Sequence, residues 1–325
     1  MKAIIPVAGI GSRLKPHTLT QPKVLLSVAG KPIIAHIMDR LVGAEIDHMV
    51  FIVGYLKDQV KAYLTSHYPS VRMDFVEQKE RKGLAHAVHL GLTDSDDPVL
   101  IILGDTIFDV DLKPVLAAGI SALGAATVDD PRRFGTIELE KGVVTRLMEK
   151  PKEPKSNLVI VGIYYIANTR LLKKSIEEIM AENITVKNEY QITDALQRMI
   201  DHGERITTFP IDGWYDCGKP ETLLATNRYL LGCNSFPIPD TPNSVFFPPV
   251  YVPKSAVVES SIVGPYTTLG ENTTVKNSVI RNSIIGDRTR VESAMLDSSI
   301  IGIRAVVEGQ FKVLNISDSS EIRIG

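Results

Sequence analysis

The chain opens with residues 2–32, KAIIPVAGIGSRLKPHTLTQPKVLLSVAGKP, and this stretch decides the fold. A short apolar run at residues 3–7 leads directly into Ala8-Gly9-Ile10-Gly11, and a helix-like apolar segment starts at residue 32. A buried strand that ends in a glycine turn and is followed by a helix is typical of an α/β sheet. Glycines at such a turn let backbone amides face an anion, so we expect phosphate to bind here.

Apolar runs and amphipathic stretches alternate through most of the sequence that follows. Strands are expected at residues 3–7, 49–53, 71–76, 98–103, 135–139, 143–149 and 159–167, and helices at residues 32–43, 57–67, 83–92, 171–181, 190–202 and 219–231. The run at 98–103 is apolar throughout, as in a strand buried on both faces of a parallel sheet, and ends at Gly104-Asp105. Ligands of open α/β sheets bind outside the carboxyl ends of the strands, so Asp105 is a candidate functional residue. The pattern predicts one α/β domain with a mixed, mostly parallel sheet.

The composition changes at residues 232–249, which hold five of the chain's 19 prolines, and we interpret this segment as a linker. Beyond it, aliphatic residues recur at six-residue steps with some slips of register. The series is Val252, Val258, Val263, Leu269, Val275, Ile285, Val291, Ile301 and Val307. This period predicts a parallel β-helix of roughly three coils, with a β-sandwich as the alternative. The predicted division is residues 1–232, a linker at 233–249, and a repeat domain at 250–325.

The glycine loop fits neither of two common phosphate-binding motifs. The dinucleotide-binding pattern needs a third glycine where Leu14 stands, and the Walker pattern needs a Gly-Lys-Ser/Thr sequence that this segment lacks. The continuation of the loop is more specific. It reads Arg13-Leu14-x-Pro16-x-Thr18-x-x-x-Pro22-Lys23-x-Leu25-Leu26-x-Val28-x-Gly30-Lys31-Pro32. This series resembles the signature of the sugar nucleotidyltransferases, also called nucleotide-diphosphate-sugar pyrophosphorylases.

The resemblance covers nearly the whole of the first 230 residues and implies both a fold and a reaction. The implied fold is a Rossmann-like nucleotidyltransferase domain followed by a short left-handed parallel β-helix. The implied reaction transfers a nucleotidyl group from a nucleoside triphosphate to a sugar 1-phosphate and releases pyrophosphate, by an in-line displacement assisted by Mg²⁺. The expected catalytic residues are Arg13, which would clamp the triphosphate, Lys23, between the two phosphates, and Lys150, which would pair with the sugar phosphate. Cations are needed because two like charges about 4 Å apart repel by roughly 4 kcal/mol at an effective dielectric constant near 20.

The same resemblance implies metal-binding and substrate-binding residues. Asp105 and Asp216 match the family's metal aspartates, and Mg²⁺ is commonly held by one or two carboxylates together with substrate phosphate. A helix cap at Asp105 and a turn residue at Asp216 are the structural alternatives. The residues expected to bind the sugar are Gly135, Glu149, Gly162, Glu189 and Trp214. The residues expected to bind the nucleotide are Ala8, Gly9, Gly11, Ser12, Gln78, Gly83, Leu84 and Ala85.

Gln78 is the residue expected to choose the base. Its amide offers a donor and an acceptor that complement the N3–H and O4 of uracil or thymine, and Gly83 would admit the base close to the backbone. UTP or dTTP, with glucose 1-phosphate, is therefore the predicted substrate pair. One methyl-sized difference is worth only about 1–3 kcal/mol, so the two triphosphates stay open. A GTP-dependent mannose-1-phosphate guanylyltransferase is the alternative.

The composition argues against several other classes of protein. The chain carries 36 basic and 38 acidic side chains, so it has no overall positive field that would gather nucleic acid or an anionic membrane. No apolar run approaches the roughly 18 residues of a membrane helix, and the start lacks a signal-peptide layout. With Cys217 and Cys233 as its two cysteines, the chain is expected to be cytoplasmic. We also expect a homo-oligomer, because the open end of a β-helix is an apolar edge that needs cover.

Two further functions compete with this interpretation. A hexapeptide-repeat acyltransferase typically needs a histidine between its coils as general base, and all seven histidines precede the repeat region. A non-catalytic scaffold usually loses Arg13, Lys23 or a metal aspartate; all are present, although Ala8 stands where the family usually has glycine. No Ser, Cys or His stands in an activated arrangement within these motifs, so we expect a single displacement without a covalent intermediate.

Overall fold

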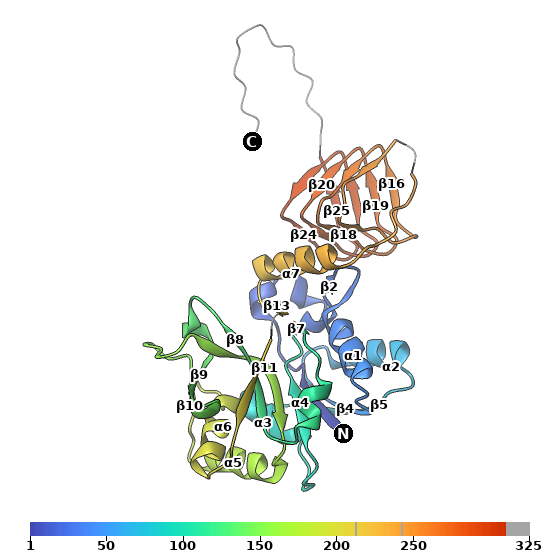
Figure 1. The fold of residues 1–325 in the computed structure, drawn as a ribbon. Coiled ribbons are helices and arrows are strands. Elements are labelled where there is room, and N and C mark those ends of the chain that lie inside the picture. The colour runs from blue at the N-terminus through green and yellow to red at the C-terminus, as the bar shows by residue number, and fades with distance from the viewer. Residues whose placement is uncertain (212, 242, 310–325) are drawn as a thin grey trace. The chain divides into compact units, whose positions relative to one another are not determined.

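The computed structural model describes residues 1–211, 213–241 and 243–309 (Figure 1). These residues form two compact units: unit 1 comprises Met1–Leu26 and Lys31–Thr226, and unit 2 comprises Ser27–Gly30 and the chain from Asn227 onward. The boundary therefore falls inside α7 (Pro220–Cys233), while the sequence-based division at 1–232, 233–249 and 250–325 stays a prediction. None of the helices in the described part of the chain has the length and apolarity that a bilayer-spanning helix needs.

A nine-stranded mixed sheet forms the centre of unit 1, in the order β5-β4-β1-β6-β11-β8-β12-β10-β9. Its strands are β1 (Lys2–Pro6), β4 (His48–Val53), β5 (Arg72–Glu77), β6 (Val99–Ile102), β8 (Ala122–Thr127), β9 (Gly135–Glu140), β10 (Val143–Glu149), β11 (Leu158–Ile166) and β12 (Thr207–Pro210). The first four strands in this order run parallel, whereas β11 pairs antiparallel with both β6 and β8. The predicted α/β fold with a mixed sheet is confirmed, but parallel pairing is concentrated in one half, so the sheet is less parallel than predicted.

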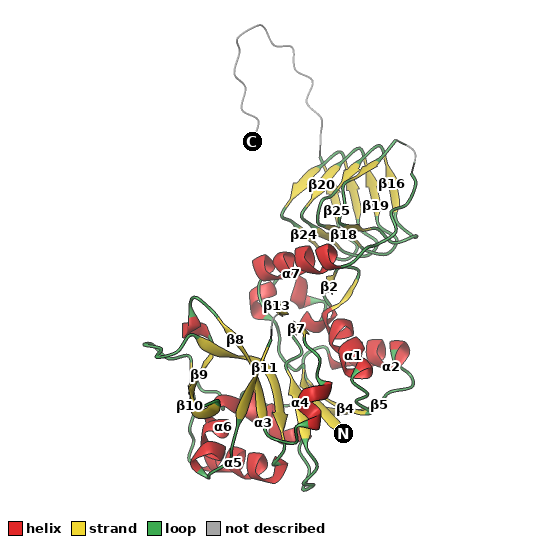
Figure 2. Cartoon of the chain, viewed as in Figure 1, coloured by secondary structure: helices red, strands yellow, loops and turns green. Residues whose placement is uncertain are grey.

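Helices cover both faces of this sheet (Figure 2). They are α1 (Ile33–Gly43), α2 (Lys57–His67), α3 (Leu84–Gly91), α4 (Lys113–Ala117), α5 (Thr169–Ala181) and α6 (Ile192–Asp201), with the short 3-10 turns η1 (Ser12–Leu14), η2 (His17–Leu19), η3 (Lys23–Leu25) and η4 (Pro131–Arg133). Successive strand residues point to opposite faces, so Ala3 and Ile5 join the core under α1 and α2, whereas Ile4 joins the core under α3, α5 and α6. This two-sided burial explains why the inner strands are apolar throughout.

A two-stranded antiparallel ribbon was not predicted. It pairs β7 (Thr106–Asp109) with β13 (Gly213–Asp216) across a long separation in the sequence. The inner strands β8 and β12 were not predicted either. The β8 sequence, ALGAAT, carries few of the β-branched and aromatic residues that mark strands. The β12 sequence, TTFP, is only four residues long and ends in proline, so it shows no extended strand pattern. The remaining short strand of unit 1 is β3 (Lys31–Pro32).

Unit 2 contains three sheets of four parallel strands each. The first has β14 (Val245–Phe246), β17 (Ile262–Val263), β20 (Val279–Arg281) and β23 (Met295–Asp297); the second has β15 (Val250–Tyr251), β18 (Thr267–Leu269), β21 (Ile284–Ile285) and β24 (Ile300–Ile301); the third has β16 (Val257–Glu259), β19 (Thr274–Lys276), β22 (Arg290–Glu292) and β25 (Val306–Glu308). Val263, Leu269, Val275 and Val291 are fully buried inside. The left-handed parallel β-helix is confirmed, with four strands in each described sheet against the roughly three coils predicted.

Serine side chains at the corners of the β-helix hydrogen-bond one coil to the next. The hydroxyls of Ser261, Ser278 and Ser283 accept from the backbone N–H of Ser278, Ala294 and Ser299, at 3.1–3.2 Å. Each bond joins residues 16 or 17 apart in the sequence. The coils are therefore one or two residues shorter than three full hexapeptides, which is the physical origin of the register slips in the aliphatic series.

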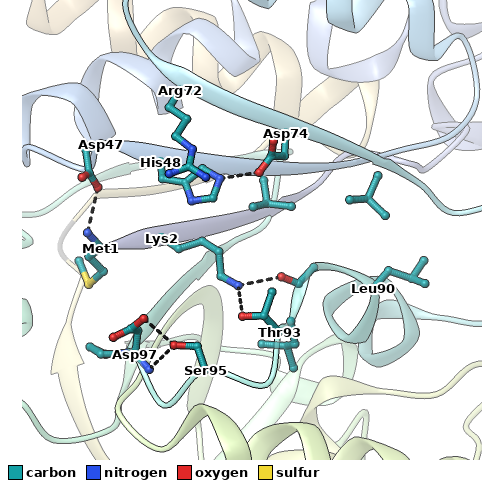
Figure 3. A pocket seen from close by; sticks show the side chains of 15 residues that line it. Met1, Lys2, Asp47, His48, Arg72, Asp74, Leu90, Thr93, Ser95 and Asp97 are labelled. Atoms are coloured by element: carbon teal, nitrogen blue, oxygen red, sulfur yellow. Dashed lines mark hydrogen bonds and ion pairs between the residues drawn. The ribbon is translucent and has the colours of Figure 1, made fainter.

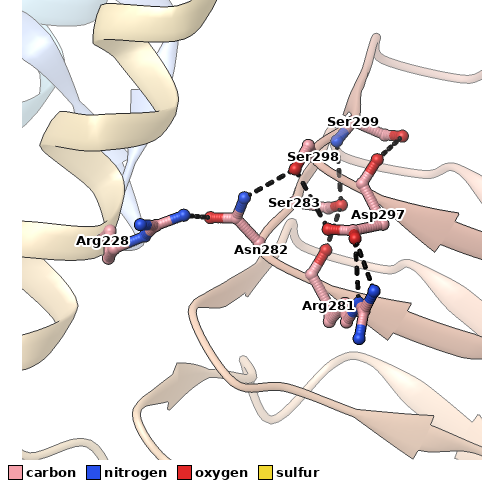
Figure 4. Close-up of polar contacts among 7 residues, drawn as sticks. All are labelled: Arg228, Arg281, Asn282, Ser283, Asp297, Ser298 and Ser299. Carbon is pink, nitrogen blue, oxygen red and sulfur yellow. Dashed lines mark hydrogen bonds and ion pairs between the residues drawn. The ribbon is translucent and has the colours of Figure 1, made fainter.

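The end of α7 packs on the β-helix within unit 2. Arg228 donates to Oδ1 of Asn282 at 2.9 Å (Figure 4) and lies over the ring of Tyr266. Asn227, which is 1% exposed, accepts from the N–H of Ala29 at 2.8 Å and from Oγ1 of Thr268 at 2.7 Å. The short strand β2 (Ser27–Val28) thus belongs to a segment held by Asn227.

Candidate active site

The carboxyl ends of the parallel strands bring three distant segments of unit 1 to one edge of the sheet. β1 runs into the glycine loop, β5 into Gln78, and β6 into the Leu103-Gly104-Asp105 turn. Backbone bonds extend this order past the strands: Gln78 donates to the carbonyl of Val53 at 2.8 Å, and Gly104 to that of Pro6 at 3.3 Å. This edge is where ligands of open α/β sheets bind.

The glycine loop folds tightly over Lys23 and Thr18. Gly11 has φ of 70°, and its carbonyl accepts a 2.9 Å bond from Oγ1 of Thr18. A Cβ at position 11 would lie 3.0 Å from both Cβ of Lys23 and Cγ2 of Thr18, so glycine is required on steric as well as conformational grounds. Gly9 faces open space, and Leu14, which is fully buried, anchors the turn that carries Ser12 and Arg13. The loop therefore leaves room for a ligand beside its backbone.

Asp105, Asp216, Lys23 and Arg13 meet in one place. The ribbon sets Asp216 opposite Thr106, and the N–H of Cys217 donates to the carbonyl of Asp105 at 3.1 Å. Lys23 forms an ion pair with Asp105. A Cβ on Gly218 would lie 2.7 Å from Oδ1 of Asp216 and 2.8 Å from Nη2 of Arg13, so glycine lets these two charged groups approach.

The neighbouring charges act on the Asp216 carboxyl in opposite directions. Burial raises the pKa of the Asp216 carboxyl, and the charge of Asp105 raises it further, whereas Lys23 and Arg13 lower it. Burial also raises the pKa of the Cys217 thiol to about 12. This thiol therefore stays protonated near neutral pH and is not a nucleophile.

The donor set of the two aspartates fits a hard divalent cation. Among the described residues, no group of three or more His, Cys, Asp or Glu side chains could enclose a metal ion. Two neighbouring carboxylates, by contrast, are the set that Mg²⁺ accepts when substrate phosphate and water complete its coordination. Asp105 and Asp216 are placed as such a pair, and a cation between them would relieve the repulsion that raises the pKa of Asp216.

The segment expected to bind the base is tied to the segment expected near the sugar. Gly83 has φ of 107°, and a Cβ there would lie 2.4 Å from the carbonyl oxygen of Tyr190. The N–H of Ala85 donates to this carbonyl at 3.0 Å, and the N–H of Tyr190 donates to the carbonyl of Lys82 at 2.8 Å. Gln78 lies against the same turn, with Leu84 as the first residue of α3. Tyr190 was not among the predicted site residues, because its contacts with this turn are made by its backbone.

The residues expected around the sugar gather at the paired ends of β9 and β10. Gly135 stands opposite Glu149 in the register, and Oε2 of Glu149 accepts from Oγ1 of Thr193 at 2.7 Å. Lys150 pairs with the same carboxylate. A Cβ on Gly135 would lie 3.0 Å from Oγ1 of Thr193, so glycine admits this hydroxyl.

The other three expected sugar residues lie on separate elements. Gly162, with φ of 84°, sits in β11, where a Cβ would lie 2.8 Å from Leu103. Trp214 packs edge-on against Phe134 at 5.0 Å between ring centroids. Glu189 accepts a long bond from Gln191. The structure thus joins Gly135 to Glu149 and Lys150 through direct contacts. Gly162, Trp214 and Glu189 each contact other residues instead.

Asp194 is a charged residue of this region that was not among the predicted site residues. It lies in the first turn of α6, and its Oδ2 is buried without a hydrogen-bond partner. Burial, followed by the charge of Glu149, raises the pKa of Asp194 to about 6. Both residues line an open crevice of about 500 Å³. Only its burial marks Asp194 as a candidate site residue, because an aspartate in the first turn of a helix is equally typical of an exposed surface.

A second cavity, of about 740 Å³, lies at the opposite edge of the sheet (Figure 3). It is lined by the amino ends of β1, β4 and β5, where Lys2 donates to the carbonyl of Gly91 at 3.0 Å and His48 pairs with Asp74. None of the predicted site residues lines it. The charges of this cavity are largely paired with one another, as in Met1 with Asp47 and His48 with Asp74.

Comparison with known proteins gives a consistent result. The family described as nucleotidyl transferase matches residues 2–232. The chain is 34% identical over 309 residues to the bifunctional protein GlmU of Methanocaldococcus jannaschii, covering 88% of this chain and 73% of the relative. It is also 34% identical over 230 residues to the UTP–glucose-1-phosphate uridylyltransferase AglF of Haloferax volcanii, covering 68% and 93%. The crystal structure of a UDP-glucose pyrophosphorylase complexed with UDP-glucose superposes with a TM-score of 0.63 at 27% identity, covering 72% of this chain and 99% of that one.

Proposed function

This chain belongs to the nucleotidyl transferase family and is an enzyme of the sugar-1-phosphate nucleotidyltransferase type, and we propose that it joins UTP or dTTP to glucose 1-phosphate. The observation that carries the proposal is the convergence of Lys23, Arg13, Asp105 and Asp216 at the carboxyl edge of the sheet. Two cations and two carboxylates beside a glycine loop suit two phosphorylated substrates better than any uncharged ligand.

The proposed reaction is one in-line displacement. An oxygen of the sugar phosphate attacks the α-phosphorus of the triphosphate, the new phosphoanhydride bond forms, and the bond to the β-phosphate breaks, so pyrophosphate leaves with the electron pair. Arg13 and Lys23 offset the charge that builds between the two phosphates, and Lys150 holds the sugar phosphate. Positioning two bound reactants is worth roughly 7–11 kcal/mol of the barrier, so no covalent intermediate is needed.

Asp105 and Asp216 would hold a Mg²⁺ ion. When bound, the ion would supply positive charge to the triphosphate oxygens. Lys23 already pairs with Asp105, and this contact keeps the lysine ammonium where it can also meet a phosphate. Asp105 and Asp216 would thereby position both the Mg²⁺ ion and the ammonium group of Lys23.

The nucleotide would lie along the glycine loop and the Gln78 turn, and the sugar beside Glu149. Ala8, Gly9, Gly11 and Ser12 would present backbone to phosphate, and Glu149 would accept hydrogen bonds from sugar hydroxyls, an orientation that Thr193 supports. The similarity to AglF, which is named a UTP–glucose-1-phosphate uridylyltransferase, supports this substrate pair. We assign the enzyme to the cytoplasm because both cysteines, Cys217 and Cys233, are free thiols.

We also propose that the chain self-associates through its β-helix. Val245, Ile262, Val279 and Met295 follow one another in register across β14, β17, β20 and β23. Met295 is 80% exposed, and Val245 50%. The neighbouring charges Arg281 and Asp297 pair with each other (Figure 4), so the face presents no net charge to repel an identical copy. A row of aliphatic side chains on a flat sheet is suited to burial against the same face of a second copy.

The direct test is an assay of pyrophosphate release. Purified protein is incubated with Mg²⁺ and each of UTP, dTTP, GTP, CTP and ATP, combined in turn with glucose, mannose and N-acetylglucosamine 1-phosphate. We expect release with UTP or dTTP and glucose 1-phosphate, inversion at the α-phosphorus, and no release from the Lys23→Ala variant. Release only with GTP and mannose 1-phosphate would favour the guanylyltransferase alternative, and silence with every pair would favour a scaffold.

A further inference from the structure

The side-chain amide of Gln78 is held by two acceptors on the following turn and helix. Gln78 is 7% exposed and stands directly after β5. Its Nε2 lies 3.1 Å from the carbonyl oxygen of Gly83 and 3.1 Å from Nδ1 of His86. An amide nitrogen carries two hydrogens, so both donors of Gln78 are used inside the protein.

The backbone carbonyl fixes which way the amide faces. A carbonyl oxygen only accepts, so the Gln78 atom beside the oxygen of Gly83 must be the nitrogen. That oxygen also accepts the N–H of Ala87 at 3.2 Å, as the first turn of α3 forms. The turn is held in place by the two backbone bonds between residues 82–85 and Tyr190. Reversing the amide would set two oxygens against each other, at the cost of an unmade hydrogen bond.

His86 takes the acceptor role because of the same arrangement. Its Nδ1 faces a nitrogen that carries hydrogen, so Nδ1 is unprotonated and the proton is on Nε2. Burial lowers the pKa of His86, and the positive charges of Lys82 and His89 lower it further, against a smaller raising effect of Glu80. The imidazole is therefore neutral near pH 7 and available as an acceptor.

We infer that His86 is a positioning residue which, with the Gly83 carbonyl, leaves only Oε1 of Gln78 to meet the nucleobase. This inference rests on the proposed function. Within the described residues, no protein group donates to Oε1. Where Oε1 faces the ring nitrogen of the base, an acceptor alone requires an imino N–H at that nitrogen, which uracil and thymine carry at N3 and guanine at N1. Cytosine and adenine present a lone pair at the matching position and are rejected, since two acceptors would then face each other.

The inference refines the expectation from the sequence. A free glutamine amide could donate and accept, and could reverse to suit cytosine as well as uracil. The amide held by Gly83 and His86 cannot reverse in this way. The selectivity for the base therefore comes from its neighbours on α3 as much as from Gln78 itself. Selection against cytosine therefore needs the acceptor at position 86.

The test compares UTP with CTP in four proteins: wild type, His86→Ala, His86→Asn and His89→Ala. Dissociation constants are measured by calorimetry in the presence of Mg²⁺, and kcat/KM is measured from pyrophosphate release with glucose 1-phosphate. We expect wild type to prefer UTP and His86→Ala to lose about fivefold to tenfold of that preference, the size of one hydrogen bond. His86→Asn, whose Oδ1 can replace Nδ1 as acceptor, should keep most of it. His89→Ala is the matched control, because His89 lies one turn further along α3 and pairs with Glu177.

Each result decides the question. Equal affinity of wild type for UTP and CTP would overturn the inference, and so would a His86→Ala variant that weakens both nucleotides equally, because this is what a merely structural histidine would do. N3-methyl-UTP, which lacks the imino N–H, should bind wild type no better than CTP. A UTP preference that depends on His86, without any pyrophosphate release, would support the inference and contradict the proposed function.

Discussion

Asp105 and Asp216 are close enough for the charge of one to raise the pKa of the other, and they lie between Lys23 and Arg13. We predict that Asp105→Asn lowers kcat at millimolar Mg²⁺ by at least about a hundredfold, because one of two metal carboxylates is lost and Lys23 loses its partner. Pyrophosphate release measured over a series of Mg²⁺ concentrations checks this. Partial recovery at high Mg²⁺ would fit a weakened metal site.

The control for this change is Asp109→Asn. Asp109 is the last residue of β7, the strand that begins directly after Asp105, and pairs with Arg40 at 2.7 Å. It should keep near-normal turnover. If both variants lose activity equally, the loss comes from the ribbon and not from the metal carboxylate.

The Gln78→Ala variant should loosen the choice of base more than it lowers kcat.

Asp194 gives a prediction on stability and pH. Its pKa is raised from 3.8 to about 6, so between these values the folded protein holds a proton that the unfolded chain has released. The contribution of Asp194 to the free energy of unfolding therefore falls as pH rises from about 4 to 6, and stays low above that. Asp194→Asn removes the effect and should raise the free energy of unfolding at pH 7 by about 1 kcal/mol, after allowance for solvent screening of a half-buried group.

Thermal unfolding of Asp194→Asn and wild type between pH 4 and 7 measures this difference. The two curves should meet near pH 4 and separate as pH rises. Asp201→Asn, at the exposed end of the same helix, is the control and should follow wild type throughout. A constant offset between Asp194→Asn and wild type at every pH would contradict the assignment.

Some parts of this site could be read from the sequence, and others could not. Asp105 could, because a fully apolar strand that ends in Gly-Asp places a carboxylate at a sheet edge. The position of Asp216 near Asp105 could not be derived from their spacing in the sequence, because the ribbon of β7 and β13 joins distant segments. The contribution of His86 depends on which atom of a neutral imidazole faces an amide, and no sequence pattern carries that information.

The last part of α7 depends on one buried amide. Asn227 accepts from Ala29 and Thr268 and donates to the carbonyl of Tyr266 at 3.3 Å, all within unit 2. Asn227→Ala would leave three buried polar groups without partners. At about 1 kcal/mol or more for each, we predict a loss of about 3 kcal/mol in the free energy of unfolding of unit 2.

Chemical denaturation, monitored by the circular dichroism of the β-helix and not by tryptophan fluorescence, measures this loss. Asn234→Ala is the matched control: Asn234 directly follows α7 and is exposed, with one hydrogen bond to the carbonyl of Leu230. It should change stability by less than about 0.5 kcal/mol. Equal effects of the two substitutions would show that Asn227 does not hold this helix end.

The elements themselves were predictable where one periodicity dominates. The six-residue series located the β-helix because Val258, Val275 and Val291 each point inward at successive coils. The prediction was low by about one coil, since β14 lies within the proline-rich segment and was interpreted as linker. β8, which pairs antiparallel with β11, was missed because its alanine and glycine residues carry no strand pattern.

The division of the chain into two units cuts across the signature at its start. Ser27–Gly30 belongs to unit 2, only a few residues after Lys23 in the sequence. Gly30 lies under the ring of Tyr251, where a Cβ would be 2.4 Å from the ring. In this chain the signature therefore combines residues of the proposed phosphate site with residues that pack within unit 2. The ring of Tyr251 explains why glycine is needed at position 30, where no ligand is expected.

The row of Val245, Ile262, Val279 and Met295, in which Val279 alone is half-buried, predicts how whole molecules associate. Burial of one such side chain against a second copy is worth roughly 2 kcal/mol, and a charge in its place cannot be buried unpaired. Met295→Glu should therefore raise the dissociation constant of the oligomer at least thirtyfold and yield monomers in light scattering, with kcat for pyrophosphate release unchanged. Val306→Glu, 65% exposed on a different sheet of the same β-helix, is the control and should leave the assembly intact. If wild type is already monomeric at high concentration, or if Val306→Glu dissociates it and Met295→Glu does not, then this face is not the one that joins the copies.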